Sequence, residues 1–507
     1  MAFATIWELL AVGRDGDAAL GAPETKALDF AGLRALARRT VADLNAMGIG
    51  RNDRVAIVLP NGPEMAASFL AIGAGATTAP LNPAYRADEF EFYLTDLKAK
   101  ALVVQAGEET PARAVAAKLG VPVVELMPDR AAGAGSFTLA AGALKGVPAQ
   151  AGFADTEDVA LVLHTSGTTS RPKIVPLAQA NVCASARHIG QTLALKPADR
   201  CLNIMPLFHI HGLIAAVLSS LAAGGQTVCT PGFNALKFFA WLEEAKPSWY
   251  TAVPTMHQAI LSRAERNREI IGRAGLRFIR SSSASLPPQV MQELEATFGC
   301  PVIESYGMTE AAHQMASNPL PPRERKPGSV GIAAGPEVRI MDEEGNLLPS
   351  GSLGEVVIRG PNVTKGYEAN PDANLKAFAN GWFRTGDQGT IDEEGYLRIT
   401  GRLKELINRG GEKVSPLEVD EVIMDHPAVQ QVVTFAMPHD KLGEEVAAAV
   451  VLREGQSATE RELRDFAAKK LADFKVPRKI VFLAEIPKGA TGKLQRIGLA
   501  GKLGLGA

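Results

Sequence analysis

The feature that most constrains the fold is a repeated alternation of amphipathic helical stretches with short apolar segments rich in Val, Ile and Leu. The apolar segments include "RVAIVLP" from Arg54, "AKALVVQA" from Ala99, "WYTAVP" from Trp249 and "LRFIRSSSA" from Leu276. Residues 33–47 are one of the helical stretches. Such alternation is typical of helices layered on largely parallel sheets. We therefore predict an α/β fold for the first part of the chain.

The pattern changes after Gly328, where shorter strands separated by turns predict an antiparallel, barrel-like subdomain. Beyond "GRLKELINRGGEKVSP" the alternation returns, with "VVTFAMP" and "AAAVVL" as strands and residues 459–471 as an amphipathic helix. A chain of 507 residues is too long for one compact core. We predict a large N-terminal domain of layered α/β sheets, residues 1–403, and a small mobile α+β domain, residues 404–507.

Composition argues against several classes of function. The 53 basic and 55 acidic residues nearly cancel, so a nucleic-acid partner held by phosphate contacts is not expected. The four cysteines lie far apart without metal-ligand spacing, so we expect reduced, buried thiols rather than zinc sites or disulfides. No apolar run is long enough for a bilayer, and the first residues contain no basic leader, so we expect no membrane partner and a cytoplasmic location.

A loop rich in Ser, Thr and Gly follows the strand-like "VALVLH" in "HTSGTTSRPKIVPL", which begins at His164. Its exposed backbone N–H groups, its hydroxyls and the charge of Lys173 suit phosphate oxygens. A Walker A loop needs GxxxxGK[ST], whereas Ile174 follows the lysine here. A nucleophile elbow needs GxSxG, whereas Ser166 is flanked by His164 and Thr168. Taken alone, the loop fits a polar turn better than a phosphate site.

Four further motifs change that balance: "SYGMTEAAHQ" from Ser305, "WFRTGDQG" from Trp382, "GRLKELINRGGEKVSP" from Gly401 and "IPKGATGKLQR" from Ile486. With the loop, in this order and spacing, they resemble the motif series of the adenylate-forming superfamily, which includes acyl-CoA synthetases and firefly luciferase. The resemblance spans most of the chain. It implies that a carboxylate attacks the α-phosphorus of ATP and that the acyl group then passes to CoA. Such phosphoryl chemistry needs positioning and charge neutralisation more than a protein nucleophile.

The resemblance also implies which residues handle the nucleotide. Those that hold the β- and γ-phosphates are Thr165, Ser166, Gly167, Thr168, Thr169 and Lys173. Thr309 meets the α-phosphate, and Glu310 holds Mg²⁺, a hard cation suited to carboxylate and phosphate oxygens. Lys493, in a glycine-containing loop, stabilises the adenylation transition state. Each also has a structural explanation: Glu310 suits a helix N-terminus, and Lys493 suits an exposed surface.

Four residues are assigned to the adenosine half of ATP. Tyr306 stacks on adenine, and Glu304 lies where the adenine amino group is commonly met. Asp387 accepts both ribose hydroxyls, and Arg402 supports them. Taken singly, Tyr306 fits a core residue better and Asp387 a turn residue better, and only the motifs together favour the functional assignment.

The resemblance further implies that the small domain rotates between two half-reactions. Lys404 matches the hinge position. Rotation withdraws Lys493 and brings in the paired glycines Gly410 and Gly411, which leave room for the pantetheine arm of CoA. A plain hairpin turn explains the same two glycines.

The acid is expected to be small and polar. Ser281, Ser282 and Ser283 stand where relatives that take fatty or aryl acids commonly carry Gly or Ala, and His209, His211 and His313 lie in neighbouring motifs. Unpaired buried polar groups against an alkyl chain would cost about 1 to 3 kcal/mol each. The segments "HTSGTTSRPK", "RSSSASLPP" and "MTEAAHQMASNPLPP" are similar to those of the oxalate-CoA ligase branch. That resemblance assigns the second carboxylate of oxalate to Ser283, His313 and His209, while His211 is the more structural histidine.

Alternatives remain open at this level. Malonate or another short acid could replace oxalate, a carrier protein could replace CoA, or the chain could be a silent nucleotide-binding module. Three positions depart from the superfamily pattern: Ile174 replaces Gly, Ser170 replaces Gly as the oxalate branch also does, and Gly489 replaces Thr. None removes a proposed catalytic group. Ile174 either shifts phosphate handling or packs inward.

Overall fold

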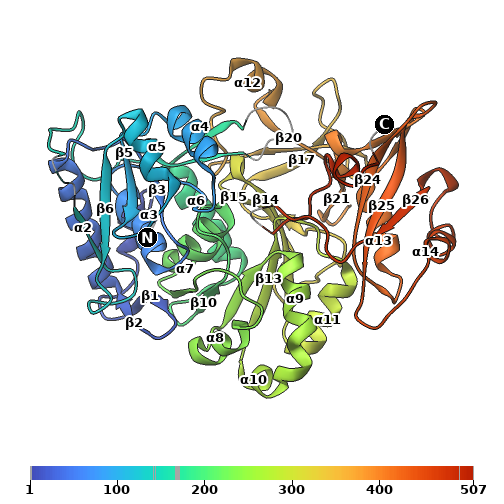
Figure 1. Ribbon diagram of the computed structural model, residues 1–507, viewed down its shortest axis with the longest axis horizontal. Coiled ribbons are helices and arrows are strands. Elements are labelled where there is room, and N and C mark those ends of the chain that lie inside the picture. Colours follow the sequence, from blue (N-terminus) through green and yellow to red (C-terminus); the bar gives the residue numbers. More distant parts are fainter. Residues whose placement is uncertain (1–2, 141, 143, 166–171, 490–491, 506–507) are drawn as a thin grey trace.

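The computed structural model describes residues 3–140, 142, 144–165, 172–489 and 492–505. Within these residues the strands form four sheets with helices packed against them (Figure 1). The seven-stranded sheet has the order β7 (Phe137–Ala140), β6 (Val123–Pro128), β5 (Ala101–Gln105), β3 (Arg54–Val58), β4 (Thr77–Pro80), β8 (Val159–His164) and β9 (Ile174–Ala178). The nine-stranded sheet has the order β16 (Ile332–Ala333), β15 (His313–Ser317), β14 (Val302–Met308), β13 (Phe278–Ser282), β12 (Trp249–Ala252), β10 (Arg200–Asn203), β11 (Gln226–Cys229), β1 (Ala18–Ala22) and β2 (Thr25–Asp29).

Two five-stranded sheets follow in the described part of the chain. The first contains β17 (Glu337–Met341), β18 (Gly354–Arg359), β20 (Trp382–Ile391), β19 (Phe378–Ala379) and β21 (Leu397–Arg402). The second contains β23 (Glu412–Val414), β22 (Ile407–Arg409), β25 (Gly443–Leu452), β24 (Val429–His439) and β26 (Lys479–Phe482).

Helices cover these sheets. The α-helices are α1 (Ile6–Leu10), α2 (Phe30–Ala46), α3 (Pro63–Gly73), α4 (Ala87–Leu97), α5 (Pro111–Leu119), α6 (Gln179–Thr192), α7 (Ser219–Ala222), α8 (Phe238–Ala245), α9 (Pro254–Ala264), α10 (Arg268–Arg273), α11 (Pro288–Phe298), α12 (Pro371–Ala377), α13 (Pro416–Met424), α14 (Glu460–Ala467) and α15 (Leu499–Lys502). A π-helix, η1 (His211–Leu218), and short 3-10 turns, η2 (Glu265–Asn267), η3 (Thr309–Ala311), η4 (Leu403–Glu405) and η5 (Asp473–Lys475), complete the set.

The two larger sheets are parallel in their interiors. β3 pairs in parallel with β4 and β5, and β12 pairs in parallel with β10 and β13. Antiparallel pairs occur toward the edges, as in β1 with β2 and β14 with β15. The four apolar segments of the sequence are β3, β5, β12 and β13, and the helix expected at residues 33–47 is α2. The predicted α/β fold is therefore confirmed.

The later part of the chain also follows the expected pattern. The strands after Gly328 pair antiparallel in β17, β18, β20 and β21. The helix predicted at residues 459–471 is the shorter α14, which begins at a capping box between Thr459 and Glu462 and ends at Ala467. The chain forms turns over the rest of that stretch.

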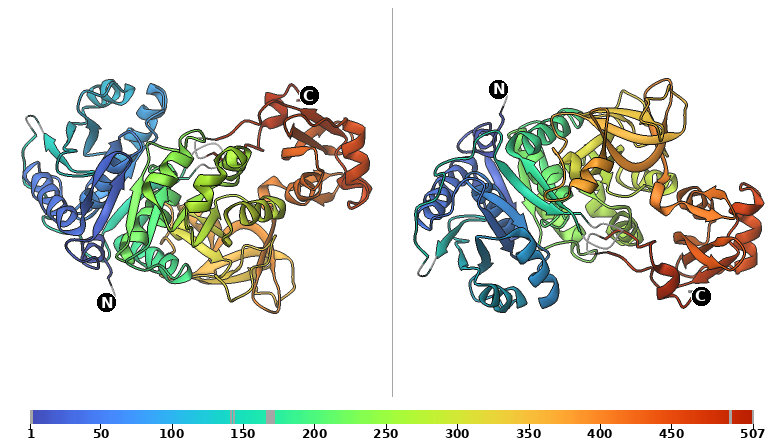
Figure 2. Two further views of the ribbon diagram at one scale, coloured as in Figure 1. Left: turned by 90° about the horizontal axis from the view of Figure 1, so that it is seen from below. Right: turned by 90° about the horizontal axis from the view of Figure 1, so that it is seen from above.

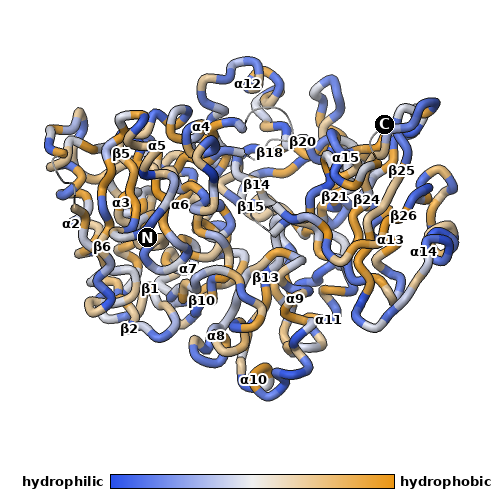
Figure 3. The backbone as a smooth tube through the Cα atoms, in the orientation of Figure 1, coloured by the Kyte–Doolittle hydropathy of each residue, from blue (hydrophilic) through white to orange (hydrophobic). Residues whose placement is uncertain are grey.

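The last sheet and its helices form a separate unit at one end of the molecule (Figure 2). Along the same unit, α14 is largely hydrophilic at the outer edge, while α13 and β25 carry more hydrophobic residues (Figure 3). A segment near the C-terminus leaves this unit and reaches back toward the middle of the molecule (Figures 1 and 2). In the described residues, no helix is both long and apolar enough to cross a membrane.

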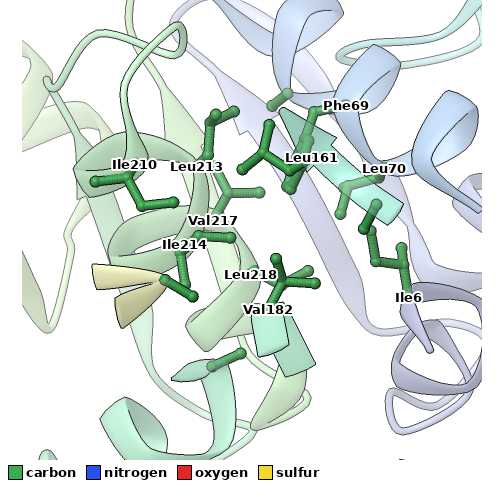
Figure 4. Close-up of a cluster of buried hydrophobic side chains, with 14 of the residues drawn as sticks. Ile6, Phe69, Leu70, Leu161, Val182, Ile210, Leu213, Ile214, Val217 and Leu218 are labelled. Atoms are coloured by element: carbon green, nitrogen blue, oxygen red, sulfur yellow. The ribbon is translucent and has the colours of Figure 1, made fainter. Parts of the chain in front are cut away.

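The core beside the site is built around η1, whose residues are all buried. Leu213 and Val217 of η1 lie against Leu161 of β8 and Phe69 of α3 in a continuous apolar cluster (Figure 4). Complete burial of a side chain of this size stabilises the fold by about 1.5 to 3 kcal/mol. Because η1 begins at His211, this packing fixes where the imidazole of His211 stands.

Candidate active site

The Ser/Thr/Gly loop connects the antiparallel strands β8 and β9. Four of its residues that were predicted to hold phosphates, Ser166, Gly167, Thr168 and Thr169, lie outside the described residues, as does Ser170. At the ends of the loop, the Thr165 N–H donates to the Lys173 carbonyl at 2.9 Å, and the Lys173 N–H donates to Thr165 Oγ1 at 3.3 Å. The loop is therefore a hairpin connection whose two ends are joined.

Ile174, the departure next to Lys173, points into the core. Its side chain is 7% exposed and packs in the apolar cluster that contains Phe90 and Val162. Its carbonyl accepts a hydrogen bond from the Glu368 N–H at 3.1 Å. Inward packing is thus what the structure shows, and any change in phosphate handling stays a prediction.

Tyr367 links the two charged residues of the phosphate end. The Lys173 Nζ lies 4.3 Å from the centre of the Tyr367 ring, and the Tyr367 hydroxyl donates to Glu310 Oε1 at 2.8 Å. Burial lowers the pKa of Lys173, the charge of Lys404 lowers it further, and Glu310 acts in the opposite direction. Thr309 and Glu310 both lie in η3, directly after β14.

Glu310 is the candidate metal ligand. Burial raises the pKa of its carboxyl, while the Tyr367 hydroxyl and the charges of Arg402 and Lys173 lower it. Among the described residues, no cluster of three or more His, Cys, Asp or Glu side chains could hold a metal ion. A single carboxylate fits Mg²⁺ bound with ATP, because this ion takes one or two carboxylates and otherwise phosphate and water oxygens.

The residues predicted to bind adenosine come from three strands. Asp387 in β20 lies opposite Arg402 in β21, and its Oδ1 accepts a hydrogen bond from Arg402 Nε at 3.0 Å. Its Oδ2 accepts a hydrogen bond from the hydroxyl of Tyr306 in β14. Burial acts to lower the pKa of Arg402, but the Asp387 carboxylate outweighs it and raises that pKa. The structure thus brings these three predicted residues together.

Glu304 lies two residues before Tyr306 in the same strand and is buried. Its Oε1 accepts a hydrogen bond from the Leu286 N–H at 2.8 Å, and its Oε2 has no partner among the described residues. Burial raises the pKa of this carboxyl to about 8. Near neutral pH the group is therefore mostly protonated and can donate as well as accept.

Lys493, in the C-terminal unit, lies near the residues predicted to bind the nucleotide. Burial lowers its pKa to about 8, Arg402 lowers it further, and Asp387 and Glu310 act in the opposite direction. The loop that carries it is held by α9, because Thr255 Oγ1 donates to the Gly492 carbonyl at 2.7 Å. Lys493 therefore lies within the electrostatic field of the same site.

The predicted acid residues also meet here. The His211 and His313 rings are 5.0 Å apart, and His211 Nδ1 lies 3.0 Å from Ser283 Oγ. His209 is half-buried next to them, with its Nδ1 accepting the His211 N–H at 3.3 Å. Burial lowers the pKa of His209 to about 3, and Lys493 adds to this. His211, expected to be more structural, is thus in direct contact with Ser283.

Two residues that contact the predicted site residues were not predicted from the sequence. Tyr367 has no signal beyond an aromatic ring within "TKGYEAN", and Arg280 looks like a strand residue in "LRFIRSSSA". Arg280 is fully buried beside His211, with Nη1 3.4 Å from Nε2 of that imidazole. An arginine inside an apolar strand segment is a signal that could have indicated it.

The hinge and CoA candidates lie in the C-terminal half. Lys404 is exposed in η4, between β21 of one sheet and β22 of the next. Gly410 and Gly411 form the exposed turn between β22 and β23, with backbone φ angles of 60° and 100° that favour glycine. The Gly410 N–H donates to the Leu442 carbonyl at 2.9 Å. Their roles as hinge and CoA passage stay predictions.

Comparison with known proteins agrees with this geometry. The family model described as AMP-binding enzyme matches residues 11–368, and the model for the AMP-binding enzyme C-terminal domain matches residues 418–493. The chain is 48% identical to an oxalate–CoA ligase of Arabidopsis thaliana, over 91% of this chain and 90% of that protein. It is 44% identical to an oxalate–CoA ligase of Saccharomyces cerevisiae, over 88% and 86% of the two chains.

The fold matches a solved relative as well. The crystal structure of ATP-bound MatB from Rhodopseudomonas palustris superposes with a TM-score of 0.87 at 32% identity, covering 98% of both chains. The resemblance stated from the motifs, including its oxalate–CoA ligase branch, is confirmed by these matches. The chain therefore belongs to the AMP-binding enzyme family.

Proposed function

We propose that this protein is an ATP-dependent acid–CoA ligase that converts oxalate, ATP and CoA to oxalyl-CoA, AMP and diphosphate. The observation that carries the proposal is the polar cluster of the buried His211 and His313 with the partly buried Ser283, close enough to Lys493 for its charge to act on His313. Such a cluster suits a small acid with polar groups at both ends and not an alkyl chain. The oxalate–CoA ligases of Arabidopsis thaliana and Saccharomyces cerevisiae support the choice of acid.

The reaction has two steps. In the first, a carboxylate oxygen of oxalate attacks the α-phosphorus of ATP, a new P–O bond forms, and the bond to the diphosphate breaks. In the second, the sulfur of the CoA thiolate attacks the acyl carbon, and AMP leaves with the electrons of the acyl–oxygen bond. Both steps develop negative charge on oxygen, so correctly placed cations accelerate them without a covalent protein intermediate.

The site residues divide this work. Lys493 would stabilise charge at the α-phosphate, Asp387 would accept from the ribose hydroxyls with Arg402 in support, and Tyr306 would stack on adenine. Lys173 would meet the β- and γ-phosphates together with the Ser/Thr/Gly loop. Proximity to Glu310 supports this placement of Lys173.

The nucleotide end is completed by three groups. Thr309 would meet the α-phosphate, Glu304 would meet the adenine amino group, and Glu310 would hold Mg²⁺. When bound, the magnesium ion would neutralise part of the phosphate charge. For the second step, the C-terminal unit would turn near Lys404, so that Lys493 leaves and Gly410 and Gly411 approach. The cytoplasmic location expected from the sequence stays a prediction.

The decisive test is a screen of acid-dependent diphosphate release. The purified chain is supplied with ATP, Mg²⁺ and either oxalate, malonate, acetate or a longer acid, with and without CoA. We expect the highest kcat/KM with oxalate and formation of oxalyl-CoA only when CoA is present. A preference for fatty acids would contradict the inference of a polar acid site. A preference for malonate would make malonate the substrate in place of oxalate. If no acid caused diphosphate release, the proposed ligase activity would be rejected.

A further inference from the structure

The acid cluster, made of His211, Ser283 and His313, lies beside a buried arginine that has no role in the reaction proposed above. Arg280 in β13 is fully buried, and among the described residues its guanidinium makes only long contacts, all to neutral groups. Its Nη1 lies 3.4 Å from both His211 Nε2 and Thr251 Oγ1, and its Nη2 lies 3.4 Å from Gln314 Oε1. Its Nε has no partner in the described part of the chain.

No carboxylate among the described residues forms an ion pair with Arg280. The side chain that accepts from Nη2 is the neutral amide of Gln314. The Nε2 of this amide donates to Thr192 Oγ1 at 3.1 Å and to the Ala334 carbonyl at 3.0 Å. The amide is thereby fixed with its oxygen toward the guanidinium. A buried charge without a counterion is costly, so an anion that enters the site gains by approaching it.

Arg280 also fixes the direction of the hydrogen bonds at His211. A guanidinium is only a donor, so His211 Nε2 must accept, and the proton of the neutral imidazole is on Nδ1. The Thr251 hydroxyl, 2.6 Å from the same Nε2, donates to it as well. Burial lowers the pKa of His211 well below its ordinary value, and His313 and Arg280 add to this, so the imidazole stays neutral.

The consequence reaches Ser283. The protonated Nδ1 of His211 donates to Ser283 Oγ at 3.0 Å, so the serine hydroxyl accepts there and keeps its own proton for another acceptor. Ser283 holds a positive φ of 76°, which is uncommon for a residue with a side chain. Next to it, His313 Nδ1 is buried with no partner among the described residues. At this cluster His313 Nδ1 therefore lacks a partner, and the Ser283 hydroxyl has its proton available for a bound acid.

We propose that Arg280 is the specificity-determining positioning residue of the acid site, selecting dicarboxylates over monocarboxylates. Its buried charge attracts the carboxylate that does not react, and its bond to His211 orients the Ser283 hydroxyl to donate to that carboxylate. This inference rests on the proposed ligase function. A purely structural role of Arg280 would affect the stability of β13, whereas the proposed role affects how strongly the site prefers a dianionic acid.

The test compares oxalate with oxamate, a monoanion of nearly the same shape. In Arg280→Met we expect the KM for oxalate to rise about tenfold or more, since a hydrogen bond to a charged group contributes about 1.5 to 3 kcal/mol. The Ki of oxamate as a competitor of oxalate, and the Kd of ATP, should stay within about threefold, and kcat should change less than KM. Equal rises for oxalate and oxamate, or an unchanged KM for oxalate, would overturn the proposal.

A second variant neutralises the buried charge of Arg280 while the arginine itself stays in place. Gln314→Glu supplies a carboxylate at 3.4 Å from Nη2, so it should also raise the KM for oxalate more than the Ki of oxamate. If Arg280→Met does not fold, Gln314→Glu still tests the inference. An unchanged ratio of oxalate KM to oxamate Ki in Gln314→Glu would contradict it. Wild-type protein without oxalate-dependent diphosphate release would instead reject the proposed function itself.

The matched control is Arg277→Met, three residues earlier. Arg277 forms an ion pair with Asp199 at 2.8 Å and is partly exposed. Its loss removes the same charge from the chain outside the acid site. The ratio of oxalate KM to oxamate Ki should therefore remain that of the wild type, and a change equal to that of Arg280→Met would overturn the inference.

Discussion

At the scale of single residues, the charge of Lys493 sets a pH limit on the first half-reaction. Its pKa is lowered to about 8, so the ammonium is complete well below pH 8, half present near pH 8 and lost above it. If this charge stabilises the adenylation transition state, kcat/KM for acid-dependent diphosphate release should fall as the pH rises through about 8. An unperturbed lysine would keep its charge to about pH 10. The pH profile of the free enzyme measures this directly.

The matching control is the thioester step from supplied acyl-adenylate, which should show no fall near pH 8. Lys493→Ala should reduce adenylation about a hundredfold or more, by analogy with the loss of one transition-state donor, and spare the thioester step. Equal losses in both steps would refute the separate role of Lys493.

Residues with a distinctive sequence context were the ones that could be anticipated. Asp387, Tyr306 and Lys493 stand in glycine-containing motifs whose order is informative, and the structure brings them to one place. Tyr367 and Arg280 contact the site only because strands and loops distant in sequence meet there. No local pattern marks Tyr367, and the arginine within an apolar strand indicates that Arg280 is unusual but not which residues it contacts, because the contacts depend on the tertiary packing of several elements.

At the scale of elements, α9 acts as the support for the Lys493 loop. Thr255 near its N-terminus binds the Gly492 carbonyl, and Val253 just before it lies 3.2 Å from where a side chain at Gly492 would begin. Thr255→Val removes the hydrogen bond but keeps the shape. Since such a bond contributes about 0.5 to 1.5 kcal/mol, adenylation should slow by roughly two- to tenfold.

Single-turnover rates of adenylation and of thioester formation test this role. The thioester step should be unchanged in Thr255→Val, and Thr255→Ser, which keeps the hydroxyl, should behave as wild type in both steps. A similar slowing in Thr255→Ser, or an equal effect on both steps, would show that α9 does not support the loop specifically.

Element type was more predictable than element extent. The periodicity of residues 33–47 and the apolar runs of β3, β5, β12 and β13 were sufficient for helix and strand, because side-chain burial follows the element's own repeat. The π-helical form of η1 was not anticipated, since an apolar run such as "GLIAAVL" has no periodicity to read. Its packing against Leu161 and Phe69 is a tertiary contact.

At the scale of the whole molecule, the proposed alternation requires that the contact between α9 and β24 break. Gln431 Nε2 of β24 donates to Gln258 Oε1 of α9 at 3.1 Å. We expect that Gln258→Cys combined with Gln431→Cys, joined by a short bis-maleimide, retains one turnover of adenylation but loses thioester formation. The four native cysteines are buried, which favours selective reaction at the new pair.

Each single cysteine variant, treated with the same reagent, serves as the control and should complete both steps. A cross-linker that contains a cleavable disulfide gives a reversible version, in which reductant should restore thioester formation. Unimpaired thioester formation in the joined protein would rule out the domain rotation about Lys404.

The overall architecture could be expected because alternating patterns and ordered motifs act over long stretches of chain. The exact pairing of distant strands could not, and β1 is the clearest case. Leu20 of β1 pairs in parallel with Thr227 of β11, although all strands of the seven-stranded sheet lie between them in the chain. Nothing in "AALGA" identifies that partner.

This late partner has a consequence for biosynthesis. At about 5 to 20 residues per second, the ribosome needs roughly 10 to 40 seconds after making β1 to make β11. During that interval the edge of β1 that β11 later covers is unpaired, which makes it a site for association with other chains. The sheet that carries Arg280, Tyr306 and His313 is therefore assembled late in translation, and the β1 edge stays open to other strands until β11 emerges.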